Sequence, residues 1–125
     1  MDNTILLVED DLDLISIYQE ILKVHGFDLH IAGNGKEAVE KFNQICPSLV
    51  IMDGEMPVLN GYEAFKQIKD IDNNAKVVIV TGYGESEPKN IDAVKQGLMK
   101  VISKPLGIDE LLSLAEKYTE VKIKT

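Results

Sequence analysis

Several features that mark other protein classes are missing from this chain of 125 residues. It has a single cysteine, Cys46, which excludes an internal disulfide. No apolar run approaches the roughly 20 residues that cross a membrane, and the first residues, MDNT, lack the basic stretch of a signal peptide. We therefore expect a cytoplasmic protein that does not insert into a membrane.

Basic residues are also few. The 13 lysine and arginine residues are outnumbered by 21 acidic residues, and the formal net charge is -8. A surface of this sign repels the phosphate backbone of nucleic acids and anionic lipids. Direct binding of nucleic acid is therefore not expected.

The length of the chain matches the commonest size of a single domain. We expect residues 1–125 to form one domain, with residues 119–125 as a C-terminal tail and no output domain attached. The chain has no internal repeat and no low-complexity segment.

Short apolar runs alternate with amphipathic stretches along the whole chain. Continuous apolar runs are typical of strands buried on both faces of a parallel sheet. Right-handed crossovers then favour a doubly wound α/β fold, with strand order 2-1-3-4-5 and helices on both faces. The predicted strands span residues 5–9, 27–32, 48–52, 76–80 and 101–103.

Apolar side chains at helical spacing follow each predicted strand and indicate five helices. We expect their first residues to follow the polar loops at the carboxyl ends of the strands. The side chains that mark the helices are Leu14, Ile17, Tyr18, Ile21 and Leu22; Ala38, Val39, Phe42 and Ile45; Tyr62, Phe65 and Ile68; Ile91, Val94 and Leu98; and Ile108, Leu111, Leu112, Ala115 and Tyr118.

Three carboxylates stand at the ends of two predicted strands: Glu9 and Asp10 after the first, and Asp53 after the third. Open α/β sheets bind ligands at this edge. Two such charges about 4 Å apart repel by roughly 4 kcal/mol at an effective dielectric constant of 20, so the cluster needs a cation. Oxygen ligands in this number suit Mg²⁺, and Asp53, alone on its strand, is the natural nucleophile for a phosphoryl group.

The chain resembles a response-regulator receiver domain over nearly its whole length. Each motif alone is weak, but five of them occur in order at the ends of the predicted strands. They are Glu9-Asp10, Asp53 within the pattern D-x-x-M-P, Gly61 in the following turn, Thr81, and Lys104-Pro105.

The resemblance implies a flavodoxin-like (βα)5 fold and a phosphoacceptor rather than an enzyme with a separate substrate. Asp53 would receive the phosphoryl group from a histidine kinase or a phosphotransfer protein, and the domain would assist its own phosphorylation and dephosphorylation. Mg²⁺, or Mn²⁺ in its place, would be held by Glu9, Asp10, Asp53 and the backbone carbonyl of Glu55.

The resemblance also implies how the phosphoryl group is sensed. Lys104 would pair with the acids and then with a phosphoryl oxygen, and Thr81 would swing inward to donate its hydroxyl. Pro105 would follow Lys104 through a cis peptide bond. Glu55 and Tyr83 stand where members of the family tune the lifetime of the phosphoryl group.

Phosphorylation would change the surface around the helix of residues 87–97 and its flanking strands. A downstream protein effector would then bind through residues 87–103 and the last helix. One position departs from the family: Val101 replaces the aromatic residue that is often found three positions before the lysine. An aromatic rotamer switch at this position is therefore excluded.

Other polar and small residues receive structural interpretations. Asp11 and Asp13 open the first helix, where carboxylates cap exposed amides. Cys46 is predicted to be a small buried hydrophobic residue. His25 and His30 are interpreted as structural or exposed, and Met52, Met56 and Met99 as packing residues.

Three other functions remain as alternatives. The first is a receiver-like module that binds partners without phosphorylation, because a fold alone does not establish a function. A small Mg²⁺-dependent phosphatase of the haloacid-dehalogenase type would use an aspartyl phosphate, but it carries the pattern D-x-D. A flavodoxin-type electron carrier shares the fold, yet the acids after the first strand would repel a flavin phosphate.

Overall fold

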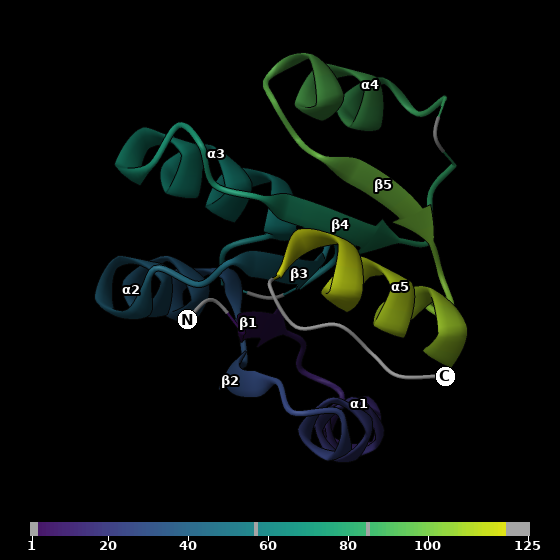
Figure 1. Ribbon diagram of the computed structural model, residues 1–125. Coiled ribbons are helices and arrows are strands. Elements are labelled where there is room, and N and C mark those ends of the chain that lie inside the picture. Colours follow the sequence, from purple (N-terminus) through teal and green to yellow (C-terminus); the bar gives the residue numbers. More distant parts are fainter. Residues whose placement is uncertain (1–2, 57, 85, 120–125) are drawn as a thin grey trace.

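The computed structural model describes residues 3–56, 58–84 and 86–119 (Figure 1). Pro57 of the D-x-x-M-P pattern and residues 120–125 of the predicted tail lie outside this part of the chain. Five parallel strands form one sheet in the order β2-β1-β3-β4-β5, which confirms the predicted fold class. The strands are β1 Thr4–Val8, β2 Asp28–Ala32, β3 Leu49–Asp53, β4 Val77–Thr81 and β5 Lys100–Ser103.

A helix follows each strand, as the sequence predicts. Three of these helices begin after a short polar side chain that accepts hydrogen bonds from the first free amides: Asp11, Asn34 and Asn60. Such residues are preferred at this position because they satisfy donors that have no partner within the helix. The helices are α1 Leu12–Val24, α2 Gly35–Ile45, α3 Gly61–Ile71, α4 Pro88–Lys95 and α5 Ile108–Tyr118.

The helices lie in two layers, with α1 and α5 on one face of the sheet and α2, α3 and α4 on the other (Figure 1). Successive side chains of a strand point to opposite faces. Ile5 and Leu7 therefore join the apolar cluster beneath α1 and α5, and Leu6 and Val8 join the cluster beneath the other three helices. All five residues of β3 and of β4 are buried, because these strands lie inside the sheet.

Helix α4 differs most from the prediction. It ends at Lys95, so Leu98 lies beyond it, and it buries Asn90 and Ala93. Ile91 and Val94, which were expected to mark its apolar face, are 44% and 51% exposed. Apolar spacing identified the helix but not the face that packs, because the buried residues include a polar one.

The expectation that Cys46 is buried is wrong. Cys46 is exposed and occupies the C-cap of α2 with φ of 44°, in the left-handed region. Cys46 ends its helix at the surface, so its position in the fold, and not its residue type, determines its exposure. Among the described residues, no helix is both long and apolar enough to cross a membrane.

Candidate functional site

Asp53 is the last residue of β3 and is only 6% exposed. Its strand lies between β1 and β4, so the loops after all three strands surround its side chain. Gly61, the first residue of α3, lies against the Asp53 backbone: a Cβ atom added at Gly61 would stand 2.4 Å from the Asp53 carbonyl oxygen. The glycine therefore allows α3 to begin directly against the backbone that carries Asp53.

The structure brings together the three acids that the sequence singled out. One carboxylate oxygen from each of Glu9, Asp10 and Asp53 can be chosen such that all three lie within 4.8 Å of one another. Asp10 is exposed, whereas Glu9 is 8% exposed. The outer acid faces solvent while the other two line the floor of the site.

The Glu9 carboxylate accepts hydrogen bonds from the backbone amides of Asp10 and Asp11, each at 3.1 Å. Burial nevertheless raises the pKa of Glu9 to about 7, and the nearby charge of Asp53 adds to the rise. The two amide bonds act in the opposite direction. A cation at the cluster would favour the ionised form, since it would compensate both effects.

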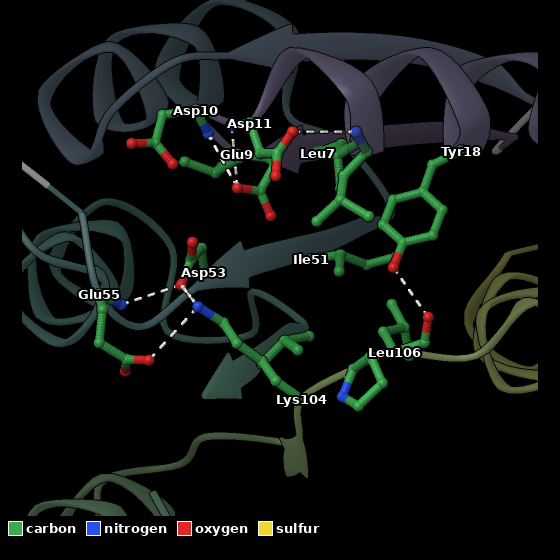
Figure 2. Close-up of a pocket in the computed structure, with 14 residues that line it drawn as sticks. Leu7, Glu9, Asp10, Asp11, Tyr18, Ile51, Asp53, Glu55, Lys104 and Leu106 are labelled. Carbon is green, nitrogen blue, oxygen red and sulfur yellow. Dashed lines mark hydrogen bonds and ion pairs between the residues drawn. The ribbon is translucent and has the colours of Figure 1, made fainter. Parts of the chain in front are cut away.

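Lys104 reaches this cluster from the loop after β5. Its Nζ lies 2.8 Å from Oδ1 of Asp53 and 3.4 Å from Oε1 of Glu55. Burial alone would lower the pKa of Lys104, but the hydrogen bond and the charge of Asp53 raise it above its usual value. Figure 2 shows the ammonium group between the two carboxylates.

The backbone holds Lys104 in this position. Its amide donates to the carbonyl oxygen of Thr81 at 2.8 Å, and the peptide bond to Pro105 is cis, as the resemblance implied. The lysine side chain runs from the end of β5 past the end of β4 to Asp53 at the end of β3.

The Glu55 side chain makes contacts that sequence reasoning missed. Its Oε2 accepts the Thr81 hydroxyl at 2.6 Å, and its Oε1 accepts the Gly82 amide at 3.0 Å. Burial raises the pKa of Glu55, but the bonds from Gly82, Thr81 and Lys104 outweigh it and hold the pKa below its usual value. The sequence analysis predicted that the backbone carbonyl of Glu55 would bind the metal. It did not predict that the side chain would bridge the ends of β4 and β5.

Asp11 has its predicted role as a helix cap, and Tyr83 lies at the edge of the site. Asp11 caps α1, its Oδ1 accepting the amides of Asp13 at 2.9 Å and Leu14 at 3.3 Å. Tyr83 is 47% exposed, and its ring lies 3.8 Å from the Lys89 Nζ on α4. Tyr83 is thus directed towards α4 and away from the acids.

A cavity of about 400 Å³ adjoins the acids (Figure 2). Its polar wall carries the acids and Lys104, and its other wall is apolar and formed by α1 and the loop before α5. The Tyr18 hydroxyl closes that end by donating to the Leu106 carbonyl at 2.8 Å. The cavity has room for a tetrahedral anion next to Asp53, and Lys104 supplies a donor there.

The donor set fits a hard divalent cation. Three carboxylates within reach of one ion are the ligands that Mg²⁺ prefers, and none of the described residues adds a thiol or an imidazole to this group. The adjoining ammonium and hydroxyl groups, from Lys104 and Thr81, suit the equatorial oxygens of a phosphoryl group.

Comparison with known proteins agrees with this geometry. The sequence profile described as "Response regulator receiver domain" matches residues 5–116. The chain is 36% identical over 118 residues to the chemotaxis protein CheY of Bacillus subtilis, and the match covers 94% of this chain and 98% of that protein.

Solved structures show the same fold. A CheY-like receiver domain from Methanospirillum hungatei superposes with a TM-score of 0.86 at 25% identity, covering 94% of this chain and 93% of that one. A CheX-CheY complex from Borrelia burgdorferi, whose description includes BeF3 and Mg²⁺, matches with a TM-score of 0.81 at 26% identity. That match covers 91% of this chain and 87% of the other.

Proposed function

Because the chain belongs to the response regulator receiver family, we propose that it accepts a phosphoryl group on Asp53 and thereby changes the partner that it binds. The donor would be a histidine kinase or a histidine phosphotransfer protein. The observation that carries the proposal is the buried Asp53 carboxylate, which lies 2.8 Å from the Lys104 ammonium and within reach of two further acids.

Mg²⁺, with Mn²⁺ as a substitute, is the proposed cofactor. Glu9, Asp10, Asp53 and the backbone carbonyl of Glu55 would hold it. Once bound, the ion would neutralise the acids and the developing charge on the phosphoryl oxygens. The carboxylate cluster, which is costly to keep ionised without a cation, supports this assignment.

The transfer itself needs a nucleophile and a leaving group. An oxygen of the Asp53 carboxylate would form the new O-P bond while the P-N bond of the donor phosphohistidine breaks. The electron pair of that bond stays on the histidine ring, which is protonated on its other nitrogen and leaves as neutral imidazole. Lys104 would orient the acceptor and then pair with a phosphoryl oxygen.

Thr81 would report the change by donating its hydroxyl to the phosphoryl group. The group adds roughly -1.5 to -2 charges and can therefore bias a two-state segment. We propose that the effector binds the surface of residues 87–103 and the last helix. The exposed apolar side chains of Ile91 and Val94 support this surface.

The side chains of Glu55 and Tyr83 are proposed to set the lifetime of the phosphoryl group. Both stand beside Thr81: the Glu55 carboxylate accepts its hydroxyl, and the Tyr83 amide donates to its Oγ1 at 3.1 Å. Substitution at either position is expected to change the rate of dephosphorylation.

A direct test is to incubate the protein with acetyl phosphate or phosphoramidate and to measure its intact mass with and without Mg²⁺. We expect one added phosphoryl group that requires Mg²⁺ and disappears in Asp53→Asn. The matched control is Asp13→Asn, which removes an exposed acid from the first turn of α1 and is expected to keep the adduct.

Three other outcomes of this test would each support a different conclusion. An adduct that persists in Asp53→Asn would place the acceptor at another residue. No adduct in the wild type, together with no binding of beryllofluoride, would favour a module that works without phosphorylation. Steady release of phosphate from general phosphoesters would indicate a phosphatase.

A further inference from the structure

The Glu55 carboxylate draws together three donors from two separate segments. It accepts the hydroxyl of Thr81 at the end of β4, the amide of Gly82 in the next loop, and the ammonium of Lys104 after β5. The distances are 2.6, 3.0 and 3.4 Å. An anion on the loop after β3 therefore already links the ends of the two neighbouring strands.

These donors border Asp53. Lys104 is shared between the two carboxylates, and Val80, the residue before Thr81, pairs in register with Asp53. A phosphoryl group on Asp53 would need donors at this place, since its oxygens carry most of its charge.

The donors cannot serve both anions at once. The Thr81 hydroxyl has one proton to give, and it is directed at Glu55 because an ionised carboxylate can only accept. Gly82 likewise has a single amide proton. A second anion in contact with Glu55 would also be repelled, because like charges at this range oppose each other.

Glu55 has space into which it can withdraw. Its side chain is 33% exposed and borders a hollow of about 550 Å³ between the loop after β3 and helices α3 and α4. Lys66, Lys89 and Glu63 line that hollow, so a displaced carboxylate would meet two ammonium groups against one carboxylate. Movement of Glu55 therefore costs less than movement of a buried residue.

From this geometry we propose that the Glu55 carboxylate is a resident anion that occupies the place of the phosphoryl oxygens in the unmodified protein. Phosphorylation has to displace it before Thr81, Gly82 and Lys104 can bind the new group. Glu55 is then a positioning residue that opposes phosphorylation and keeps the loop after β4 in its resting form. The inference rests on the proposed function of Asp53.

The test compares the affinity for beryllofluoride, an analogue of the phosphoryl group, in saturating Mg²⁺. We expect Glu55→Ala and Glu55→Gln to bind it about tenfold more tightly than the wild type. The matched control is Glu63→Gln, which removes one exposed charge that borders the same hollow but contacts none of the three donors. Its affinity is expected to stay within about twofold of the wild type.

The sign of the change separates this role from a structural one. If Glu55 merely braced the loop after β4, its removal would loosen the donors and weaken the binding of the analogue. Unchanged or weaker binding in both Glu55 variants would therefore overturn the proposal. An equal gain in Glu63→Gln would also overturn it, because general electrostatics would then explain the effect.

A double-mutant cycle with Thr81→Ala adds a second readout. Without the hydroxyl, the resident anion is held less firmly, so the gain from Glu55→Ala is expected to fall at least threefold. An undiminished gain would show that Glu55 does not act through Thr81. The Gly82 amide resonance provides the spectroscopic measure: in the wild type without analogue it should shift on Glu55→Ala and not on Glu63→Gln.

The same measurement distinguishes a failure of the phosphoacceptor function of Asp53 from a failure of the proposed role of Glu55. If neither the wild type nor any variant binds beryllofluoride with Mg²⁺, the phosphoacceptor function fails, and the competition fails with it. If the wild type binds and the Glu55 variants bind no better, only the role of Glu55 is rejected.

Discussion

Helices α1 and α4 both follow strands that carry site residues, yet they are held in different ways. Helix α1 has 13 residues, a capping aspartate, and the buried side chains of Tyr18 and Leu22. Helix α4 has 8 residues, its N-cap Glu87 makes no capping bond through its side chain, and it buries Asn90 and Ala93. The two ends of the site therefore differ in how much packing and capping hold them.

The difference matches what each region has to do. The loop before α1 carries two of the acids, and their positions must persist if they are to share one cation. Two of the three donors that change partner in the proposed switch, Thr81 and Gly82, lie at the end of β4 and in the loop that leads to α4. Segments that move are drawn from the weakly held parts of a fold, since a small change in free energy must shift their population.

The largest expected contrast concerns apolar packing. Leu22→Ala removes a fully buried side chain of α1 and is expected to lower the free energy of unfolding by about 2–5 kcal/mol. Val94→Ala shortens a side chain of α4 that is 51% exposed and should change it by less than about 0.5 kcal/mol. Urea denaturation of both variants measures the contrast, and equal losses would contradict it.

The pH dependence tests the loop before α1. The pKa of Glu9 is about 7 in the folded protein against 4.5 when accessible, so the folded state holds a proton that the unfolded state has lost. The stability due to this proton is full below about pH 4.5 and is lost as the pH rises towards 7.

We expect this loss to reach about 2–3 kcal/mol in the absence of Mg²⁺ and to be missing in Glu9→Gln. Urea denaturation across this pH range, with and without Mg²⁺, measures it. If Mg²⁺ binds the acids, its addition near neutral pH should restore stability to the wild type more than to the variant. Parallel pH profiles for the two proteins would contradict the prediction.

Asn90 provides a polar anchor for α4. It is 1% exposed, accepts the Tyr62 hydroxyl, and donates to the Gly84 carbonyl at 2.7 Å. Asn90→Ala is expected to cost about 1–2 kcal/mol, because the buried partners lose their bonds. Hydrogen exchange should show the loss mainly in α4 and the loop before it. An even loss of protection over the whole sheet would contradict a local anchor.

The smallest contrast concerns the helix caps. Asp11→Ala removes the side chain that accepts two amides at the start of α1 and should cost about 1 kcal/mol. Glu87→Ser would supply α4 with a preferred capping residue and should stabilise it by up to about 1 kcal/mol. Thermal unfolding measures both changes, and a loss of stability in Glu87→Ser would contradict the view that α4 lacks a cap.

Most of the fold could be predicted from local patterns. Continuous apolar runs identified β1, β3 and β4, because an inner strand buried on both faces has no polar side to display. The edge strand β2 contains Asp28 and His30 and was marked instead by the turn residues that follow it. Aspartate, asparagine and glycine marked the helix ends for their own backbone reasons. The exposure of Ile91, Val94 and Cys46 could not be predicted from such patterns, since it depends on the neighbours that each side chain meets.

Residue type and spacing along the chain were enough to predict the order of strands and helices, the acids at the strand ends, and the family to which the chain belongs. The contacts of Glu55 with Thr81, Gly82 and Lys104 became visible only in the folded chain. These residues are 26 to 49 positions away from Glu55. They meet because parallel strands bring the loops at their carboxyl ends to one edge of the sheet.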